Sequence, residues 1–192
     1  MMRYLVSILL ILVVVLASGT YFFRSYWEHR FDEMITRQAR IYRLDERLVW
    51  SLIYEETWFR DDALGDDDEV GLMQVTPVVA REWAKETGLR EFERVTAEDV
   101  VNFLSDPERN IQIGCWYLEK RRESYRGLPA ETAMALGAYN AGASRVEEWT
   151  RGVDVSQLSE AAFVSRIGIS STRAYVSSIL ERYRSEKSIL SK

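Results

Sequence analysis

Apolar residues follow one another almost without interruption at residues 4–23, a stretch long enough to cross a bilayer as a helix. We therefore expect this segment to contact a membrane. A cleaved signal peptide is the alternative, because Arg3 gives a short positive start and small residues near the end of the stretch loosely resemble a cleavage site. The aromatic residues Tyr21, Phe22 and Phe23 favour an uncleaved anchor, since such side chains suit a membrane interface. Either alternative exports the rest of the chain.

After residue 25, apolar residues recur at helical spacing and helix-capping residues precede several of the apolar runs. The predicted helix starts are Asp45, Thr76 before Pro77, Asp106 before Pro107, and Ser144, which with Glu147 forms a capping box. A last helix has an apolar face made by Tyr175, Val176, Ile179, Leu180 and Tyr183. No stretch alternates as a strand does, although a short hairpin fits between Asp61 and Met73. The pattern predicts a mainly α protein, with residues 1–24 as the membrane segment and residues 25–192 as one domain.

Composition narrows the function classes. The 192 residues, of which 47% are hydrophobic, suffice for one core, and a net charge of -5 with scattered Lys and Arg excludes a basic nucleic-acid surface. With one cysteine, Cys115, and one histidine, His29, there is no internal disulfide and no zinc-type ligand set. The acidic run at residues 61–69 does not follow the spacing of a calcium loop, so we interpret it as a solvated surface loop. We therefore expect neither a metal nor a cofactor.

One carboxylic acid falls on the apolar side of a predicted helix. In the helix that begins after Asp45, the apolar positions are centred on the direction of Glu56, whereas Glu55 lies at their edge. Burial would raise the pKa of Glu56, as a general acid that keeps its proton near neutral pH requires. The alternative is a helix that ends near Trp58 and leaves Glu56 in solvent. Periodicity alone does not decide between the two.

Four separated blocks of the chain resemble the soluble lytic transglycosylase family, in the family's order. They are similar to its glutamate-serine signature, its Gly-Leu-Met-Gln segment, the segment that follows and its Ala-Tyr-Asn-Ala-Gly element, at residues 53–59 (IYEETWF), 71–77 (GLMQVTP), 106–111 (DPERNI) and 138–142 (AYNAG). In the first block Thr57 replaces the serine. The likeness covers roughly residues 34–183, and several blocks in order are far more specific than one short motif.

The resemblance implies that Glu56 is the catalytic residue and that a sugar-binding cleft surrounds it. The substrate-binding residues that it implies are Thr57, Met73, Gln74, Tyr139, Asn140 and Tyr175. Met73 and Tyr139 also fit plain core packing, so both interpretations stay open for them. Two positions depart from the family pattern: Ser171 stands where a glutamate is common, and Gly65 where a serine often contacts the sugar N-acetyl region. We expect some substrate contact to be lost or replaced.

The chemistry that the resemblance implies needs a single carboxylic acid. Glu56 would protonate the glycosidic oxygen of the MurNAc-GlcNAc bond and then remove the proton from the substrate's own C6 hydroxyl, which leaves a 1,6-anhydromuramic end. Hydrolysing glycosidases ordinarily use two carboxyl groups, so a muramidase is the nearest rival. An inactive peptidoglycan-binding scaffold is a further alternative.

The same resemblance implies a fold, a partner and a location. The fold is a lysozyme-like helical domain, and the partner is the peptidoglycan glycan strand. The location is the bacterial envelope, with the chain anchored in the inner membrane and the domain outside the cytoplasm. Small tethered members often serve envelope-spanning machinery, but no residue of this sequence selects one machine.

Overall fold

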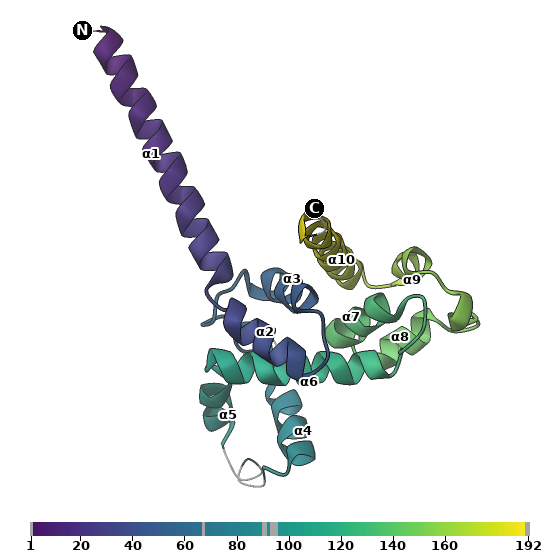
Figure 1. Ribbon diagram of the computed structural model, residues 1–192. Helices are drawn as coiled ribbons and strands as arrows, with labels where there is room; N and C mark the ends of the chain where they lie inside the picture. The colour runs from purple at the N-terminus through teal and green to yellow at the C-terminus, as the bar shows by residue number, and fades with distance from the viewer. Residues whose placement is uncertain (1, 67, 90–91, 93–95, 191–192) are drawn as a thin grey trace. The chain divides into compact units, whose positions relative to one another are not determined.

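The structure, a computed structural model, describes residues 2–66, 68–89, 92 and 96–190 and divides into two units between Glu33 and Met34 (Figure 1). The first unit is dominated by α1 (Met2–His29). One apolar stretch of the described chain, within Ser7–Ile41, is long enough to cross a membrane, with a mean hydropathy of 2.0 and no part of it buried. The side chains from Ile8 to Leu16 are all more than half exposed. A signal sequence has the same properties, so the anchor remains a prediction.

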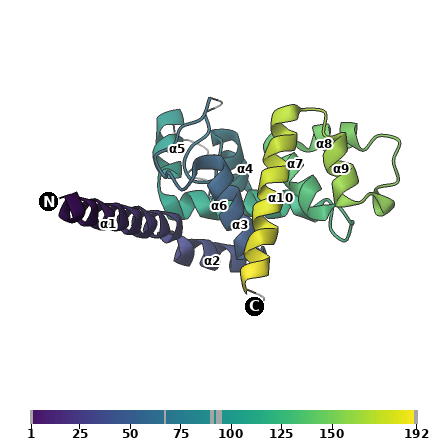
Figure 2. The ribbon, with the colours of Figure 1, turned by 90° about the horizontal axis from the view of Figure 1, so that it is seen from above.

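The second unit is built of helices. They are α3 (Glu46–Thr57), α4 (Pro77–Thr87), α5 (Ala97–Leu104), α6 (Pro107–Glu123), α7 (Glu131–Ala141), α8 (Ala143–Trp149), the 3-10 turn Val155–Gln157, α9 (Glu160–Arg166) and α10 (Ser170–Leu190), with α2 (Asp32–Ile41) at its start. The central helix α6 packs against α4, α5 and α7, while α10 lies beside α3, α7 and α9 (Figure 2). The predicted mainly α class is confirmed.

Three of the predicted helix starts carry the expected caps. The side chain of Asp45 accepts a hydrogen bond from the backbone N–H of Arg47, and Thr76 and Asp106 accept equivalent bonds at the starts of α4 and α6. The prediction at Ser144 is wrong, because α8 begins at Ala143 after Gly142 and has no side-chain cap. Gly142, with φ of 87°, turns the chain directly from α7 into α8, so Ser144 already lies inside the helix.

The hairpin predicted between Asp61 and Met73 is reduced to isolated bridges. Leu64 pairs with Val70 and Val70 with Val75, and no strand is formed in the described part of the chain. The reason is a tight turn: Gly71 and Gln74 both have positive φ, of 71° and 46°. Such backbone angles interrupt a ladder and bring the loop between α3 and α4 back over the end of α3.

Candidate active site

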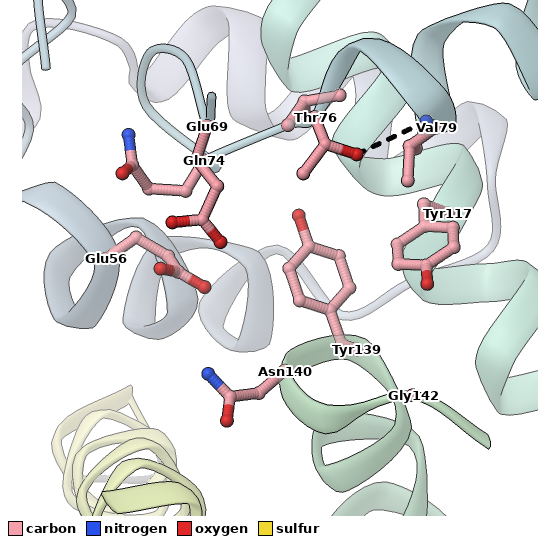
Figure 3. A pocket seen from close by; sticks show the side chains of 10 residues that line it. Glu56, Glu69, Gln74, Thr76, Val79, Tyr117, Tyr139, Asn140 and Gly142 are labelled. Carbon is pink, nitrogen blue, oxygen red and sulfur yellow. Dashed lines mark hydrogen bonds between the residues drawn. The ribbon is translucent and has the colours of Figure 1, made fainter. Parts of the chain in front are cut away.

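A pocket of about 250 Å³ opens where the end of α3, the loop before α4 and the helices α4, α6 and α7 meet (Figure 3). It is lined by Glu56, Glu69, Gln74, Val75, Thr76, Val79, Tyr117, Tyr139, Asn140 and Gly142. Four of the seven residues predicted for the site thus lie on its wall. Figure 3 shows the carboxyl groups of Glu56 and Glu69 pointing into the same part of the pocket.

Glu56 occupies the last turn of α3. Glu56 lies on the same side of the helix as the fully buried Leu52 and Ile53. The helix ends at Thr57, because Trp58 adopts a left-handed conformation. Burial raises the pKa of Glu56 to about 8, the negative charges of Glu69 and Glu55 add to this, and a hydrogen bond from Tyr175 opposes it. A carboxyl group with this pKa holds its proton at neutral pH and can donate it.

The neighbouring Glu55 has different surroundings. Its Oε2 accepts a hydrogen bond from the Ser178 hydroxyl at 2.5 Å and lies 3.5 Å from the guanidinium of Arg182. The same guanidinium lies over the ring of Tyr54, 3.7 Å from its centre. Glu55 therefore joins α3 to α10, and it is not one of the pocket-lining residues.

Two tyrosines make hydrogen bonds at the site. The hydroxyl of Tyr175 donates to Oε1 of Glu56 at 2.6 Å. The hydroxyl of Tyr139 instead donates to the backbone carbonyl of Met73 at 2.7 Å, and its ring packs against that of Tyr117 with 5.2 Å between centres. Burial and the charge of Glu56 raise the pKa of both hydroxyls well above the usual value, so both stay protonated. Of these two tyrosines, both of which the family resemblance implies for substrate binding, Tyr175 makes the direct hydrogen bond to Glu56.

Asn110 of α6 fixes the loop that carries Met73, and sequence reasoning did not single it out. Its Oδ1 accepts from the backbone N–H of Met73 at 2.8 Å, and its Nδ2 donates to the carbonyls of Val70 at 2.7 Å and Leu104 at 3.0 Å. The side chain is fully buried. Gly71 allows this close approach, since a Cβ there would lie 2.5 Å from Nδ2. The sequence signal that could have identified Asn110 was a polar residue directly beside the apolar face of the predicted helix.

The remaining predicted residues divide into two groups. Gln74 and Asn140 line the pocket, where Nε2 of Gln74 donates to the carbonyl of Gly71 and Oδ1 of Asn140 accepts from the Thr172 hydroxyl. Thr57 and Met73 do not line it. The buried Thr57 hydroxyl donates to the carbonyls of Leu72 and Ile53, at 3.1 and 3.3 Å, and the Met73 side chain is fully buried against Gly114.

Glu69 belongs to the acidic run that the sequence predicts to be a solvated loop, yet it lines the pocket. The loop residues Asp62, Asp66 and Asp68 are exposed, whereas Glu69 is partly buried and its carboxylate packs over Gly65. The bridge between Leu64 and Val70 turns the adjacent Glu69 inward. Nothing in the local sequence distinguishes it from its acidic neighbours, of which Asp67 lies outside the described residues.

Within the described ranges there is no group of three or more histidine, cysteine or acidic side chains placed to hold a metal ion. Cys115 is fully buried in α6, and burial raises the pKa of its thiol well above the usual value. Neither feature adds a nucleophile or a metal ligand to the pocket. The chemistry available here is that of carboxyl, hydroxyl and amide groups.

Comparison with solved structures places the fold among lytic transglycosylases. The lytic transglycosylase Slt of Pseudomonas aeruginosa, solved as an inactive glutamate-to-glutamine mutant, matches 82% of this chain with a TM-score of 0.69 and 25% identity, and the match covers 24% of its own chain. A lysozyme-like helical domain with a buried glutamate, Glu56, at its pocket is therefore the class that fold and site define.

Residues 33–160 match the model of the transglycosylase SLT domain, and the chain belongs to this family. The soluble lytic murein transglycosylase of Escherichia coli K12 is 34% identical over 161 residues, which are 80% of this chain and 23% of that protein. The membrane-bound lytic murein transglycosylase C of Edwardsiella ictaluri is 30% identical over 122 residues, 62% of this chain and 33% of that protein. The chain thus spans about a quarter to a third of the length of the curated relatives it matches.

Proposed function

We propose that this chain is a peptidoglycan lytic transglycosylase, in which Glu56 alone serves as general acid and general base. The observation that carries the proposal is the position of Glu56: it lies in a pocket, keeps its proton at neutral pH and accepts a hydrogen bond from Tyr175. Membership of the transglycosylase SLT domain family and similarity to proteins named lytic murein transglycosylases support it.

The first half of the reaction uses the protonated acid. Glu56 donates its proton to the glycosidic oxygen between MurNAc and GlcNAc, and the bond from that oxygen to C1 of MurNAc breaks as positive charge develops at C1. The GlcNAc portion leaves with the transferred proton as a new hydroxyl. The raised pKa makes this step possible near neutral pH, because an ordinary glutamate would already be ionised there.

The second half uses the carboxylate that remains. Glu56 removes the proton from the C6 hydroxyl of the same MurNAc, and the C6 oxygen bonds to C1 to give the 1,6-anhydro ring. The acid is thereby regenerated and no water is consumed. An attack from within the same sugar has a high effective concentration, and the Tyr175 hydroxyl stabilises the carboxylate between the two halves by donating to it.

The pocket also offers groups that hold the sugars. Gln74 and Asn140 present amides that suit the N-acetyl groups of the substrate, and the rings of Tyr139 and Tyr117 provide apolar surface for a sugar face. Tyr175 contacts the reacting region through Glu56. For Thr57 and Met73 we propose a supporting role, because both are buried and bond or pack within the loop rather than at its surface.

A muramidase that hydrolyses the same bond is the second candidate, and one observation favours it. Glu69 lies in the pocket with Glu56, and hydrolysing glycosidases ordinarily use a pair of carboxyl groups. The two candidates differ in the nucleophile, which is water in hydrolysis and the C6 hydroxyl in transglycosylation.

For the location we propose the cell envelope. The apolar helix and the similarity to a membrane-bound lytic murein transglycosylase support a chain tethered in the inner membrane, with its domain facing peptidoglycan outside the cytoplasm. Recruitment by an envelope-spanning machine fits such a tether. We propose no particular machine.

Replacement of Glu56 with glutamine tests the catalytic assignment. Glutamine keeps the shape and cannot donate a proton as an acid, so release of soluble fragments from purified peptidoglycan should fall by a factor of at least about 10³. Glu55→Gln is the matched control, because it removes the same charge one residue away and should retain most of the activity. A Glu56→Gln protein that keeps its fold and releases fragments at the wild-type rate would refute the assignment and would support neither enzyme.

A further inference from the structure

The acidic side chain of Glu69 has no role in the mechanism above, although it shares the pocket with Glu56. Its carboxylate approaches Gly65 so closely that a Cβ on that glycine would lie 2.5 Å from Oε2. Oε1 of Gln74 would lie 2.7 Å from the same Cβ. Gly65 therefore leaves the space in which the carboxylate of Glu69 and the amide of Gln74 come together at the pocket wall.

Figure 3 shows how this placement relates the two acids. Glu56 enters the pocket from the end of α3 and Glu69 from the loop that lies over it, with their carboxyl groups directed toward each other. When two carboxyl groups share one pocket, ionisation of the second requires additional free energy, because its negative charge is repelled by the first. The more buried group of such a pair keeps the proton.

We propose that Glu69 is a positioning residue for catalysis, whose carboxylate faces Glu56 across the pocket and keeps the transferable proton on Glu56. This assignment rests on the proposed function, since it concerns the acid that starts the reaction. The negative charge of Glu69 is one cause of the raised pKa of Glu56. The repulsion between the two groups then favours return of a proton to Glu56 from the C6 hydroxyl, so the same charge serves both halves of the reaction.

The other titratable groups around Glu56 do not replace this effect. They are Glu55 on the same helix, Tyr175 and Arg182 on α10, Tyr139 on α7 and Tyr117 on α6. Glu55 is engaged by Ser178 and Arg182. The hydroxyls of Tyr139 and Tyr175 stay protonated, because burial raises the pKa of both well above the usual value. Two negative charges raise the pKa of Glu56, those of Glu69 and Glu55. The effect of Glu69 is the larger of the two.

The test is the pH dependence of kcat/KM for fragment release by the full chain and its Glu69→Gln variant. Glutamine preserves the size of the side chain but removes its charge. The pH at which kcat/KM falls on the alkaline side (the alkaline limb) should therefore decrease by about one pH unit. Activity should then fall up to about tenfold above pH 8 and change little near pH 5.5. Asp66→Asn is the matched control, because Asp66 is an exposed acid of the same loop and its replacement should leave the limb in place.

A second variant guards against a loop that fails to fold. Glu69→Asp keeps the charge and withdraws it by one methylene, so its alkaline limb should lie between those of the wild type and Glu69→Gln. If the folded Glu69→Gln variant has its alkaline limb at the same pH as the wild type, the role of Glu69 is overturned, whatever the absolute value of kcat/KM. An equal shift in Asp66→Asn overturns it too. A wild-type protein that releases no fragments at any pH overturns the proposed function instead, so the two failures are distinguishable.

Discussion

Adjacent glutamates at the end of α3 show how much a residue's chemistry depends on its direction. Glu55 points to Ser178 and Arg182 of α10 and serves as a structural partner, whereas Glu56 points into the pocket and keeps a proton. Helical phase predicted the directions, because Glu56 is centred on the apolar side and Glu55 lies at its edge, but it did not decide between burial and exposure of Glu56. Helical phase could not predict the hydrogen bond from Tyr175 to Glu56, since the two residues are 119 positions apart in sequence.

The hydrogen bond from Tyr175 should tune Glu56 in the direction opposite to Glu69. It favours the carboxylate, so Tyr175→Phe should raise the pKa of Glu56 further and move the alkaline limb of kcat/KM to higher pH. The carboxylate that acts as base in the second half would lose its donor, so kcat at neutral pH should fall by about 10–100-fold. Steady-state rates measured from pH 5 to pH 9.5 check both effects, and a limb that moves to lower pH would contradict the role given to Tyr175.

The raised pKa of Glu56 also predicts a pH-dependent stability. It is about 8 in the folded chain against an ordinary value of 4.5, so the native state binds more protons than the unfolded state between these values. Stability is therefore lost as the pH rises from about 4.5 through 8. Glu56→Gln removes this cost and should be more stable than the wild type by about 2–4 kcal/mol at pH 8.5, with little difference near pH 4. Urea unfolding at the two pH values measures it, and an equal gain at both would contradict burial as the cause.

At the scale of elements, the site depends on a loop held by one buried amide. Asn110 bonds to the backbone of Met73, Val70 and Leu104, and the Met73 carbonyl in turn accepts from Tyr139. This arrangement connects α5, α6 and α7 to the pocket wall. It explains why Met73 matters for the site although its side chain is fully buried.

Replacement of Asn110 with leucine should therefore affect both stability and activity. Leucine has a similar size but removes the Asn110 bonds to the buried N–H of Met73 and to the carbonyl of Leu104, while the carbonyl of Val70 keeps its bond from the N–H of Val75. The loss should cost about 2–4 kcal/mol of unfolding free energy. The loop would lose its register, so kcat/KM should also fall. Urea unfolding and fragment release measure the two losses, and Gln112→Leu on the same helix is the control. Wild-type stability in Asn110→Leu would show that the loop is held by other contacts.

Helix starts were predictable where the signal is local. Asp45, Thr76 and Asp106 each cap a helix within three residues of their own position, and the pattern identifies them directly. Ser144 failed because the backbone turn at Gly142 comes first. The inward placement of Glu69 depends on how the loop before α4 folds back, which a run of similar acidic residues does not reveal. Local signals thus predicted the frame of the site, and tertiary folding decided its electrostatics.

For the whole molecule, we predict that the apolar first helix attaches the chain to a membrane and that the rest of the chain is active without it. A chain without residues 1–24 should remain in the aqueous fraction and release fragments from purified peptidoglycan, whereas the full chain should sediment with membranes until detergent is added. Fractionation and an intact-mass measurement of the extracted protein check this. A full-length chain that stays in the aqueous fraction would contradict the anchor, and an intact mass lacking the first segment would show a cleaved signal.

Membership of the transglycosylase SLT domain family and the pocket around Glu56 together predict which end the cleaved glycan strand carries. The decisive measurement is mass spectrometry of the fragments that the full chain releases from purified peptidoglycan. Attack by the C6 hydroxyl predicts fragments that end in 1,6-anhydromuramic acid. Fragments that end in reducing MurNAc would contradict transglycosylation and assign the pair of Glu56 and Glu69 to a hydrolase.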